Sequence, residues 1–403
     1  MYNRVFESVE ILLNWIEQNQ YKSYDHYDYW SSKFGLFSRR IFYRNKFLGL
    51  PLISSVYLID NLFPGFRGVF AKKESSAESV PRIVMAYFRL FQCTNNSSYL
   101  QKGCALLDWL VDNVSLTNHG LGWGLHFDWE EIAPMFTPCT TITAYSTEAL
   151  IMGFNLTGNI KYLNCALQTG EFVAKDLNRR EFENSTALSY TPIDNHYVIN
   201  ANSYSARILL DCLKIKKDET KFVLMNKIVN YILEQQNSDG SWYYYDKQTV
   251  PTKKNFIDSF HTCFVLENLF EIWNYNKNDN VLDSLKNGFE FFLNNFINED
   301  YSIRYYFTYP YPTGISVDIR GCAETIYCCT LLSEIFPHSL EIAEKISNWV
   351  IKYMQDKDGY FYFRIILGYK QKFPYIRWAQ APMLNALTFL LQQTKGTVND
   401  SHR

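Results

Sequence analysis

Asp258 and His261 are three residues apart at the start of an apolar run, so in a helix their side chains would share one face. A carboxylate beside an imidazole can raise the pKa of the histidine and fix its tautomer, which suits proton transfer. Asp318 opens the next similar segment and could face Asp258, and paired carboxylates are what glycoside cleavage needs. We therefore predict Asp258, His261 and Asp318 as catalytic residues. In the simpler alternative, both aspartates only cap helices and His261 is a core residue.

Several other residues at comparable positions could hold a substrate. Arg377 has no acidic residue within four positions and precedes Trp378, so it could bind a carboxylate or phosphate while the indole stacks. Arg320 is a further candidate, although its spacing from Glu324 also favours an intrahelical ion pair. Asp128 lies among aromatic residues that would raise its pKa by desolvation. The predicted substrate-binding residues are Trp123, His126, Asp128, Trp129, Tyr145, Asn202, Trp242, Arg320, Arg377, Trp378 and Gln380.

The elements that carry these residues recur along the chain about every 60 residues. Each begins with polar or aromatic residues and continues as an apolar helix, and the openings are at Thr140, Asn200, Phe256, Asp318 and Tyr375. The first four are followed by a short turn and a more amphipathic helix. A sixth pair has an outer helix near 4–17 and an inner one near 77–91. We predict an all-α fold, an (α/α)6 toroid of six helical hairpins in one domain over residues 1–403, with an irregular aromatic-rich insertion at 22–75.

The connections in this toroid would differ between its two rims. Those from inner to outer helices are short, whereas those from outer to inner helices are long, and long loops are often functional. The long loops would emerge where the inner helices begin, and helix N-termini favour negative charge. Aromatic residues there could form a cup for a polyhydroxylated ligand, although many must also fill the ring centre. The aromatic loop segments are 122–129, 240–246, 304–312 and 359–364.

Composition excludes several classes of function. The 39 basic and 41 acidic residues give a net charge of -2, which argues against a nucleic-acid partner. No signal peptide or membrane-spanning run is visible, so we expect a cytoplasmic protein. The nine cysteines do not resemble a disulfide framework, and no phosphate-binding loop or dinucleotide fingerprint indicates a cofactor. We do not predict a metal site. The less favoured alternative is that His261 and Cys322, on adjacent inner helices, bind a metal ion.

A set of motifs spread over nearly the whole chain resembles one family. IDxFHT (257–262) and PYxRWxQA (374–381) are the most specific. The others are YDxYD (24–28), WGxxFDW (123–129), SYTPxD (189–194) followed by NAN (200–202), DGSWYY (239–244) and DGYFYF (358–363). The chain resembles bacterial toroid proteins encoded with surface-polysaccharide genes, which are related in fold to six-hairpin glycosidases and N-acylglucosamine epimerases. It departs from them at Pro138-Cys139-Thr140.

This resemblance implies a role in making capsule, exopolysaccharide or lipopolysaccharide. Together with the residues, it leads us to expect glycosidase- or lyase-like acid/base chemistry on a sugar or a lipid- or nucleotide-linked glycan intermediate. Contacts with other polysaccharide-assembly proteins could accompany this role. One alternative is an epimerase or isomerase, in which His261 and either His126 or Tyr145 move protons on opposite faces of one carbon. Another is a non-catalytic glycan-binding assembly factor.

Overall fold

The computed structural model describes residues 2–129 and 132–400, with side chains up to residue 395. In this part of the chain, six inner helices pack side by side in a closed ring. In ring order they are α5 (Val80–Thr94), α7 (Thr140–Thr157), α9 (Ile199–Ile215), α11 (Ser259–Asn276), α13 (Ile319–Leu332) and α15 (Ala381–Asp400). The last of them contacts the first, so the predicted (α/α)6 toroid is confirmed.

The outer layer consists of six more amphipathic helices. They are α1 (Tyr2–Gln18), α6 (Ser97–Asp112), α8 (Ile160–Lys175), α10 (Glu219–Gln235), α12 (Asp279–Phe296) and α14 (His338–Tyr353). Several of these helices follow a short turn and begin at a capping residue. The side chains of Asn96, Asn159 and Asn278 each accept a hydrogen bond from a backbone N–H of the first turn of α6, α8 and α12. Helix α1 packs on α15 and α14, so the two ends of the chain close the ring.

The long connections gather at one rim and form small antiparallel sheets. β1 (Ser115–Leu116) pairs with β2 (Leu121–Gly122), and β3 (Arg179–Glu181) with β4 (Thr186–Leu188). β5 (Ile257–Asp258) pairs with β6 (Tyr306–Thr308), while β7 (Ile315–Asp318) pairs with β8 (Arg364–Ile366), which also pairs with β9 (Tyr369–Gln371). In the last two sheets, the strand before an inner helix bonds to the loop after the next outer helix. Each such sheet fixes the start of one inner helix.

Asp258 and Asp318 occupy equivalent places in this rim. Each is the last residue of a rim strand and the N-cap of the following inner helix, α11 or α13. Their strand partners are Tyr306 and Arg364. Further along the rim are two single turns, the 3-10 turn η2 (Thr252–Lys254) and the π-helical turn η3 (Ile376–Gln380) before α15.

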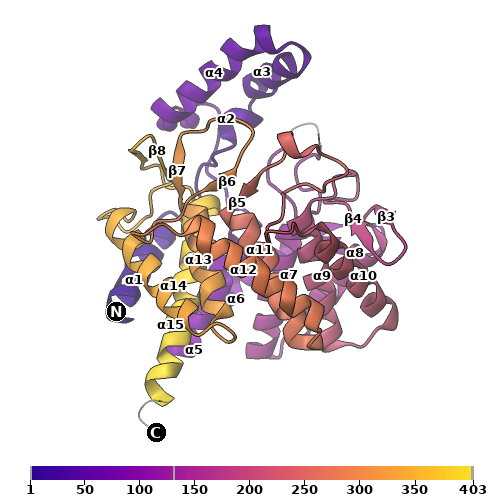
Figure 1. The fold of residues 1–403 in the computed structure, drawn as a ribbon. Coiled ribbons are helices and arrows are strands. Elements are labelled where there is room, and N and C mark those ends of the chain that lie inside the picture. Colours follow the sequence, from indigo (N-terminus) through magenta and orange to yellow (C-terminus); the bar gives the residue numbers. More distant parts are fainter. Residues whose placement is uncertain (1, 130–131, 401–403) are drawn as a thin grey trace.

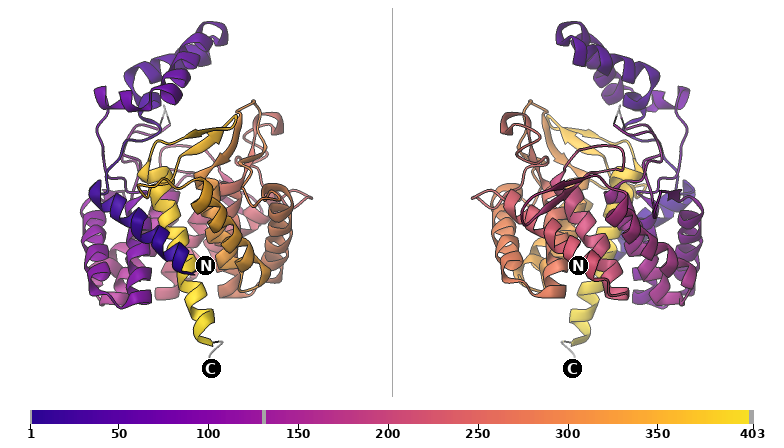
Figure 2. Two further views of the ribbon diagram at one scale, coloured as in Figure 1. Left: turned by 90° about the vertical axis from the view of Figure 1, so that its left-hand side faces the viewer. Right: turned by 90° about the vertical axis from the view of Figure 1, so that its right-hand side faces the viewer.

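The insertion that we expected to be irregular is largely helical. It forms α2 (Asp28–Ser31), α3 (Lys33–Arg44), α4 (Lys46–Leu62) and the 3-10 turn η1 (Pro64–Val69). Ser32 caps α3 and Asn45 caps α4, so the helix boundaries are encoded locally. Helices α3 and α4 form a hairpin that stands off the ring, beyond the rim that carries the small sheets (Figures 1 and 2). Among helices of the described residues, none has the length and apolar character needed to span a bilayer.

Candidate active site

A cavity of about 430 Å³ opens among the rim loops and the first turns of the inner helices. Its size is within the range of small-molecule sites. We call it the cup. Its aromatic wall consists of Tyr27, Phe127, Trp129, Tyr145, Tyr190, Tyr244, Tyr245, Phe256, Phe260, Phe264, Tyr305, Tyr306, Tyr309 and Trp378. The predicted aromatic cup at the rim is therefore present, and it offers ring faces against which the apolar face of a sugar could stack.

His261 and Asp258 form a hydrogen-bonded pair in the wall of the cup. The distance from Asp258 Oδ2 to His261 Nδ1 is 2.7 Å, and Asp258 Oδ1 accepts a hydrogen bond of 2.9 Å from the His261 backbone N–H. The carboxylate is almost fully buried, whereas 21% of the imidazole is exposed. Because an ionised carboxylate can only accept, Nδ1 carries the hydrogen and Nε2 is the nitrogen that can take up a proton.

Aromatic rings hold this imidazole in place. The ring centroid of His261 is 3.9 Å from that of Phe260 and 4.4 Å from that of Tyr244. Packing and the bond to Asp258 together restrict both the position and the tautomer of the ring. A base that is oriented in this way needs little rearrangement before it accepts a proton.

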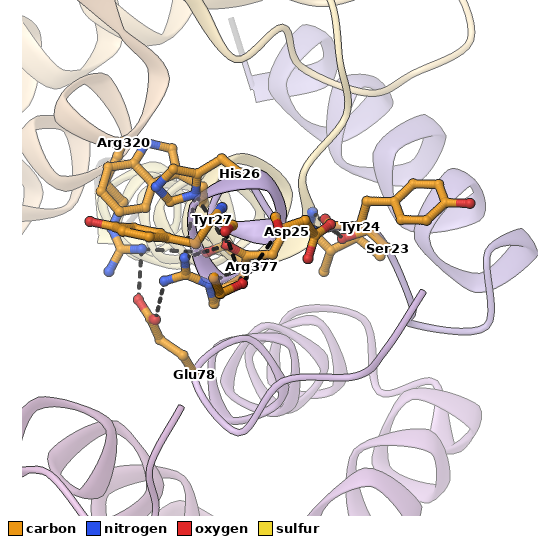
Figure 3. Close-up of polar contacts among 12 residues, drawn as sticks. Ser23, Tyr24, Asp25, His26, Tyr27, Glu78, Arg320 and Arg377 are labelled. Carbon is orange, nitrogen blue, oxygen red and sulfur yellow. Dashed lines mark hydrogen bonds and ion pairs between the residues drawn. The ribbon is translucent and has the colours of Figure 1, made fainter. Parts of the chain in front are cut away.

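The floor of the cup is a chain of buried ion pairs. Glu78, from the turn before α5, lies between Arg320 and Arg377, at 3.0 Å and 2.7 Å from the nearest guanidinium nitrogens (Figure 3). Burial alone would raise the pKa of Glu78, but the two guanidinium groups outweigh it and lower the pKa to about 2. Glu78 is therefore a permanent anion at neutral pH and has no proton to donate.

Arg377 is held by acidic residues that are distant in the sequence. Its guanidinium donates to both carboxylate oxygens of Asp25, from the YDxYD segment, as well as to Glu78. We expected Arg377 to be available for an acidic ligand because no acidic residue lies near it in the sequence. The structure removes that reason, since two carboxylates already neutralise its charge. Arg377 still lines the cup.

Arg320 forms the intrahelical contact that we considered as its alternative role. Its Nε is 2.7 Å from Glu324 Oε1, although the two atoms lack the alignment of a hydrogen bond, and Glu324 also accepts a bond of 2.6 Å from Arg82. The ion-pair chain thus continues from the cup floor into the ring interior. Alternating charges of this kind satisfy groups that would be costly to bury alone.

Asp318 lies behind Trp378 and is not among the residues that line the cup. It is 2% exposed, and its Oδ1 accepts hydrogen bonds from the indole N–H of Trp378 (2.8 Å) and the backbone N–H of Arg320 (2.9 Å). Burial raises the pKa of this carboxyl to about 6. In this arrangement Asp318 orients Trp378, which is part of the wall.

Half of the predicted site residues lie at the cup. These are Asp258, His261, Trp129, Tyr145, Arg320, Arg377 and Trp378. In contrast, Trp123 and Trp242 are buried in the core, where their indole N–H groups donate to the backbone oxygens of Leu110 and Ile232. His126 is on the same loop as Phe127 but is not part of the lining. Many of the aromatic residues in the wall of the cup are therefore not among the substrate-binding residues that we predicted from the sequence.

The predicted polar residues Asn202 and Gln380 also have structural positions. Asn202 exchanges hydrogen bonds with the backbone of Leu188, and Gln380 does the same with the backbone of Phe361. Each amide thus ties a rim segment to the start of an inner helix. Asp128 is exposed on its loop and accepts a hydrogen bond from the Met135 backbone. As placed, these three side chains do not line the cup.

Sequence reasoning missed Glu78 and most of the tyrosines of the wall. Glu78 belongs to none of the motifs, and its importance follows only from the two arginines that it joins. For the tyrosines, the aromatic loop segments were a usable signal, but they could not show which rings face inward.

Among the described residues, no cluster of three His, Cys, Asp or Glu side chains is arranged to hold a metal ion. All nine cysteines are free thiols.

Solved structures with this architecture include several enzymes that act on sugars. A cellobiose 2-epimerase from Bacillus thermoamylovorans B4167 is 14% identical, with a TM-score of 0.64 over 80% of this chain and 88% of that chain. A D-mannose isomerase is 12% identical, with a TM-score of 0.60 over 78% and 86%. A GH76 α-mannanase from Bacteroides thetaiotaomicron is 10% identical, with a TM-score of 0.59 over 81% and 88%. At such low identity these similarities establish the fold.

No protein-family model and no curated protein matches the chain.

Proposed function

We propose that the protein transfers protons at a carbon atom of a sugar, as an epimerase or isomerase, with His261 as the base. The observation that carries this proposal is the His261–Asp258 pair, which presents an oriented imidazole to an aromatic cup. Asp258 would hold the hydrogen on Nδ1 and stabilise the imidazolium that forms when Nε2 accepts a proton. The epimerase and isomerase among the similar structures support the same class of reaction.

The return of the proton requires an acid on another side of the cup. Tyr145, on α7, lines the cup, and its hydroxyl is 2.7 Å from that of Tyr204. Burial raises the pKa of Tyr145 to about 12, so this phenol is protonated at neutral pH and can donate. Tyr145 and His261 come from different inner helices, which agrees with proton transfer from two directions.

Hydrolysis by paired carboxylates, our first expectation, has less support from this geometry. Such a reaction needs one protonated and one ionised carboxyl group on either side of the scissile bond. Both oxygens of Asp258 already accept hydrogen bonds from His261, and Asp318 lies behind Trp378. Glu78 is fixed as an anion by two arginines. A proton-transfer role uses these side chains as they are placed.

The substrate that we propose is a sugar or a lipid- or nucleotide-linked glycan intermediate of surface-polysaccharide assembly in the cytoplasm. The sequence motifs carry this part of the proposal. The cup adds that the sugar needs no strong acidic group, because the arginines of the floor are already neutralised by carboxylates.

The test is deuterium uptake from heavy water. The protein would be incubated with mannose, glucose, cellobiose and N-acetylglucosamine, and the sugars analysed by mass spectrometry. We expect one deuterium per sugar without cleavage, lost in His261→Ala and retained in His119→Ala, which removes an exposed histidine with a similar aspartate contact. New reducing ends without deuterium would support hydrolysis, and an unsaturated product a lyase. Quenching of tryptophan fluorescence by a sugar, without any turnover, would support the alternative of a non-catalytic glycan-binding protein.

A further inference from the structure

The hairpin of α3 and α4 has an unusual surface for a water-soluble domain. Thirteen of the 27 exposed large apolar side chains among the described residues lie between positions 34 and 70. They are Phe34, Phe37, Tyr43, Phe47, Leu48, Leu50, Tyr57, Leu58, Leu62, Phe63, Phe66, Val69 and Phe70. Nine of them belong to α3 and α4, and the last four lie in or beside η1. Apolar groups gathered in this way on one exposed region mark an interaction site.

These side chains are exposed because the two helices bury little except each other. Gly49 is packed so closely on Phe42 that an added Cβ would lie 2.1 Å from its Cα. Helices α3 and α4 contact each other and α2, and the pair stands off the ring (Figure 2). Their outward surfaces therefore remain uncovered, and Phe47 at the tip is 87% exposed.

The charge of this region is opposite to that of the rest of the chain. Residues 29–73 contain eight Lys or Arg and a single acid, Asp60, whereas the remaining residues contain 31 basic and 40 acidic ones. Asp60 is buried and paired with Arg67. Lys33, Arg44 and Lys46 are exposed beside the apolar side chains. A surface that is both apolar and basic complements anionic lipid.

The distribution of apolar residues on α4 favours a lipid surface over a protein partner. Between Lys46 and Asp60 the helix has no charged residue, and its exposed apolar side chains cover about half of its circumference, from Tyr57 through Phe47 to Leu48. A protein groove would cover one stripe of a helix, whereas lipid can surround it. Helix α4 is among the described helices that lack the length and apolar character to span a membrane, which agrees with insertion at its surface.

We propose that the α3–α4 hairpin docks the protein on an anionic lipid surface, with the apolar side chains of α4 at the boundary between headgroups and acyl chains. Lys33, Arg44 and Lys46 contact the headgroups. The hairpin lies at the same end of the molecule as the rim that holds the cup (Figure 1). A docked molecule would therefore hold its cup close to the membrane. This docking does not depend on the chemistry of the cup.

The test is flotation of the full-length protein with vesicles of phosphatidylglycerol, compared with vesicles of phosphatidylcholine. We expect binding to the anionic vesicles that weakens with salt. The double variant Arg44→Glu/Lys46→Glu should weaken it on the order of a hundredfold. Phe47→Ser/Leu50→Ser should weaken it at least about tenfold. Thermal unfolding of each variant checks that the fold is intact.

Matched controls come from the opposite rim. Ile160 is 58% exposed, close to the 57% of Leu50, and Lys217 is exposed in a short connection. Ile160→Ser and Lys217→Glu should leave vesicle binding unchanged. The proposal is overturned if the wild-type protein does not bind anionic vesicles, or if the controls weaken binding as much as the hairpin variants. It is also overturned if Phe47→Ser/Leu50→Ser only converts a dimer to a monomer, because the hairpin would then join two copies.

Discussion

Two histidines of this protein make nearly the same contacts in different surroundings. His261 Nδ1 is 2.7 Å from Asp258, and His119 Nδ1 is also 2.7 Å from Asp176. In both cases the same carboxylate also accepts from the histidine backbone N–H. However, the His119 side chain is 53% exposed, whereas that of His261 is 21% exposed within an aromatic cup. The pair alone is therefore no evidence of catalysis, and the enclosing wall makes the difference.

The largest expected effect comes from removing each imidazole. His261→Ala should lower kcat by about 100-fold to about 10,000-fold, because the base of the reaction is lost. His119→Ala should leave kcat unchanged. Deuterium incorporation into the sugar would measure both. Equal activity of the two variants would show that the enclosed pair is not catalytic.

The next effect concerns the carboxylates. Asp258→Asn should lower kcat at least about tenfold, because an amide no longer fixes the hydrogen on Nδ1 or stabilises the imidazolium. Asp176→Asn should leave activity unchanged but lower stability by about 1–3 kcal/mol, because the nearly buried carboxylate accepts hydrogen bonds from Thr117 and His119. A pH profile of kcat for Asp258→Asn would separate lost charge from misfolding, since only the former moves the profile while leaving the unfolding temperature near that of the wild type.

Asp318 caps its helix as Asp258 does, but its carboxylate accepts a hydrogen bond from the Trp378 indole instead of contacting a histidine. Its pKa is raised from 3.8 to about 6 by burial, so the folded state favours the protonated form. This contribution to stability is complete below about pH 4 and is lost as the pH rises through about 6. Asp318→Asn should thus be more stable than the wild type by about 2 kcal/mol at pH 8, and equally stable near pH 4. Chemical denaturation at both pH values would measure this, and a variant that is less stable at pH 8 would contradict it.

The smallest effect is expected at the wall itself. Trp378→Phe keeps a ring for stacking but removes the N–H that bonds to Asp318. We expect a several-fold rise in KM with kcat nearly unchanged, because only part of the stacking surface is lost. Steady-state kinetics would separate the two constants. A large fall in kcat would instead point to a direct role of Trp378 or Asp318 in the reaction.

The fold and the contact between Asp258 and His261 could be predicted from local patterns. Asp258 and His261 meet because an N-cap and a residue in the first helical turn are adjacent whatever surrounds them. The His119 contact spans 57 residues and had no such signal. Likewise, Asp318 was correctly placed as a possible cap, but its partner Trp378 is 60 residues away.

The insertion shows the same limit in another form. Its basic and apolar composition is readable in the sequence, and its caps Ser32 and Asn45 could have indicated two helices. We expected an irregular, aromatic-rich segment because the inner and outer helix pattern is interrupted there. Whether Phe47 and its neighbours were covered by the ring could not be read from composition, since burial depends on where the hairpin stands.

The sequence by itself determined the ring of helical hairpins, the aromatic rim and the His261–Asp258 contact. These depend on hydrophobic periodicity and on hydrogen bonds within one helical turn, which few residues specify. Only the tertiary structure decided that Arg377 is neutralised by Asp25 and Glu78, from 352 and 299 residues away. It also decided which aromatic rings face the cup and which pack in the core. Closing the ring brings together segments from both ends of the chain, and side-chain contacts across it depend on that closure.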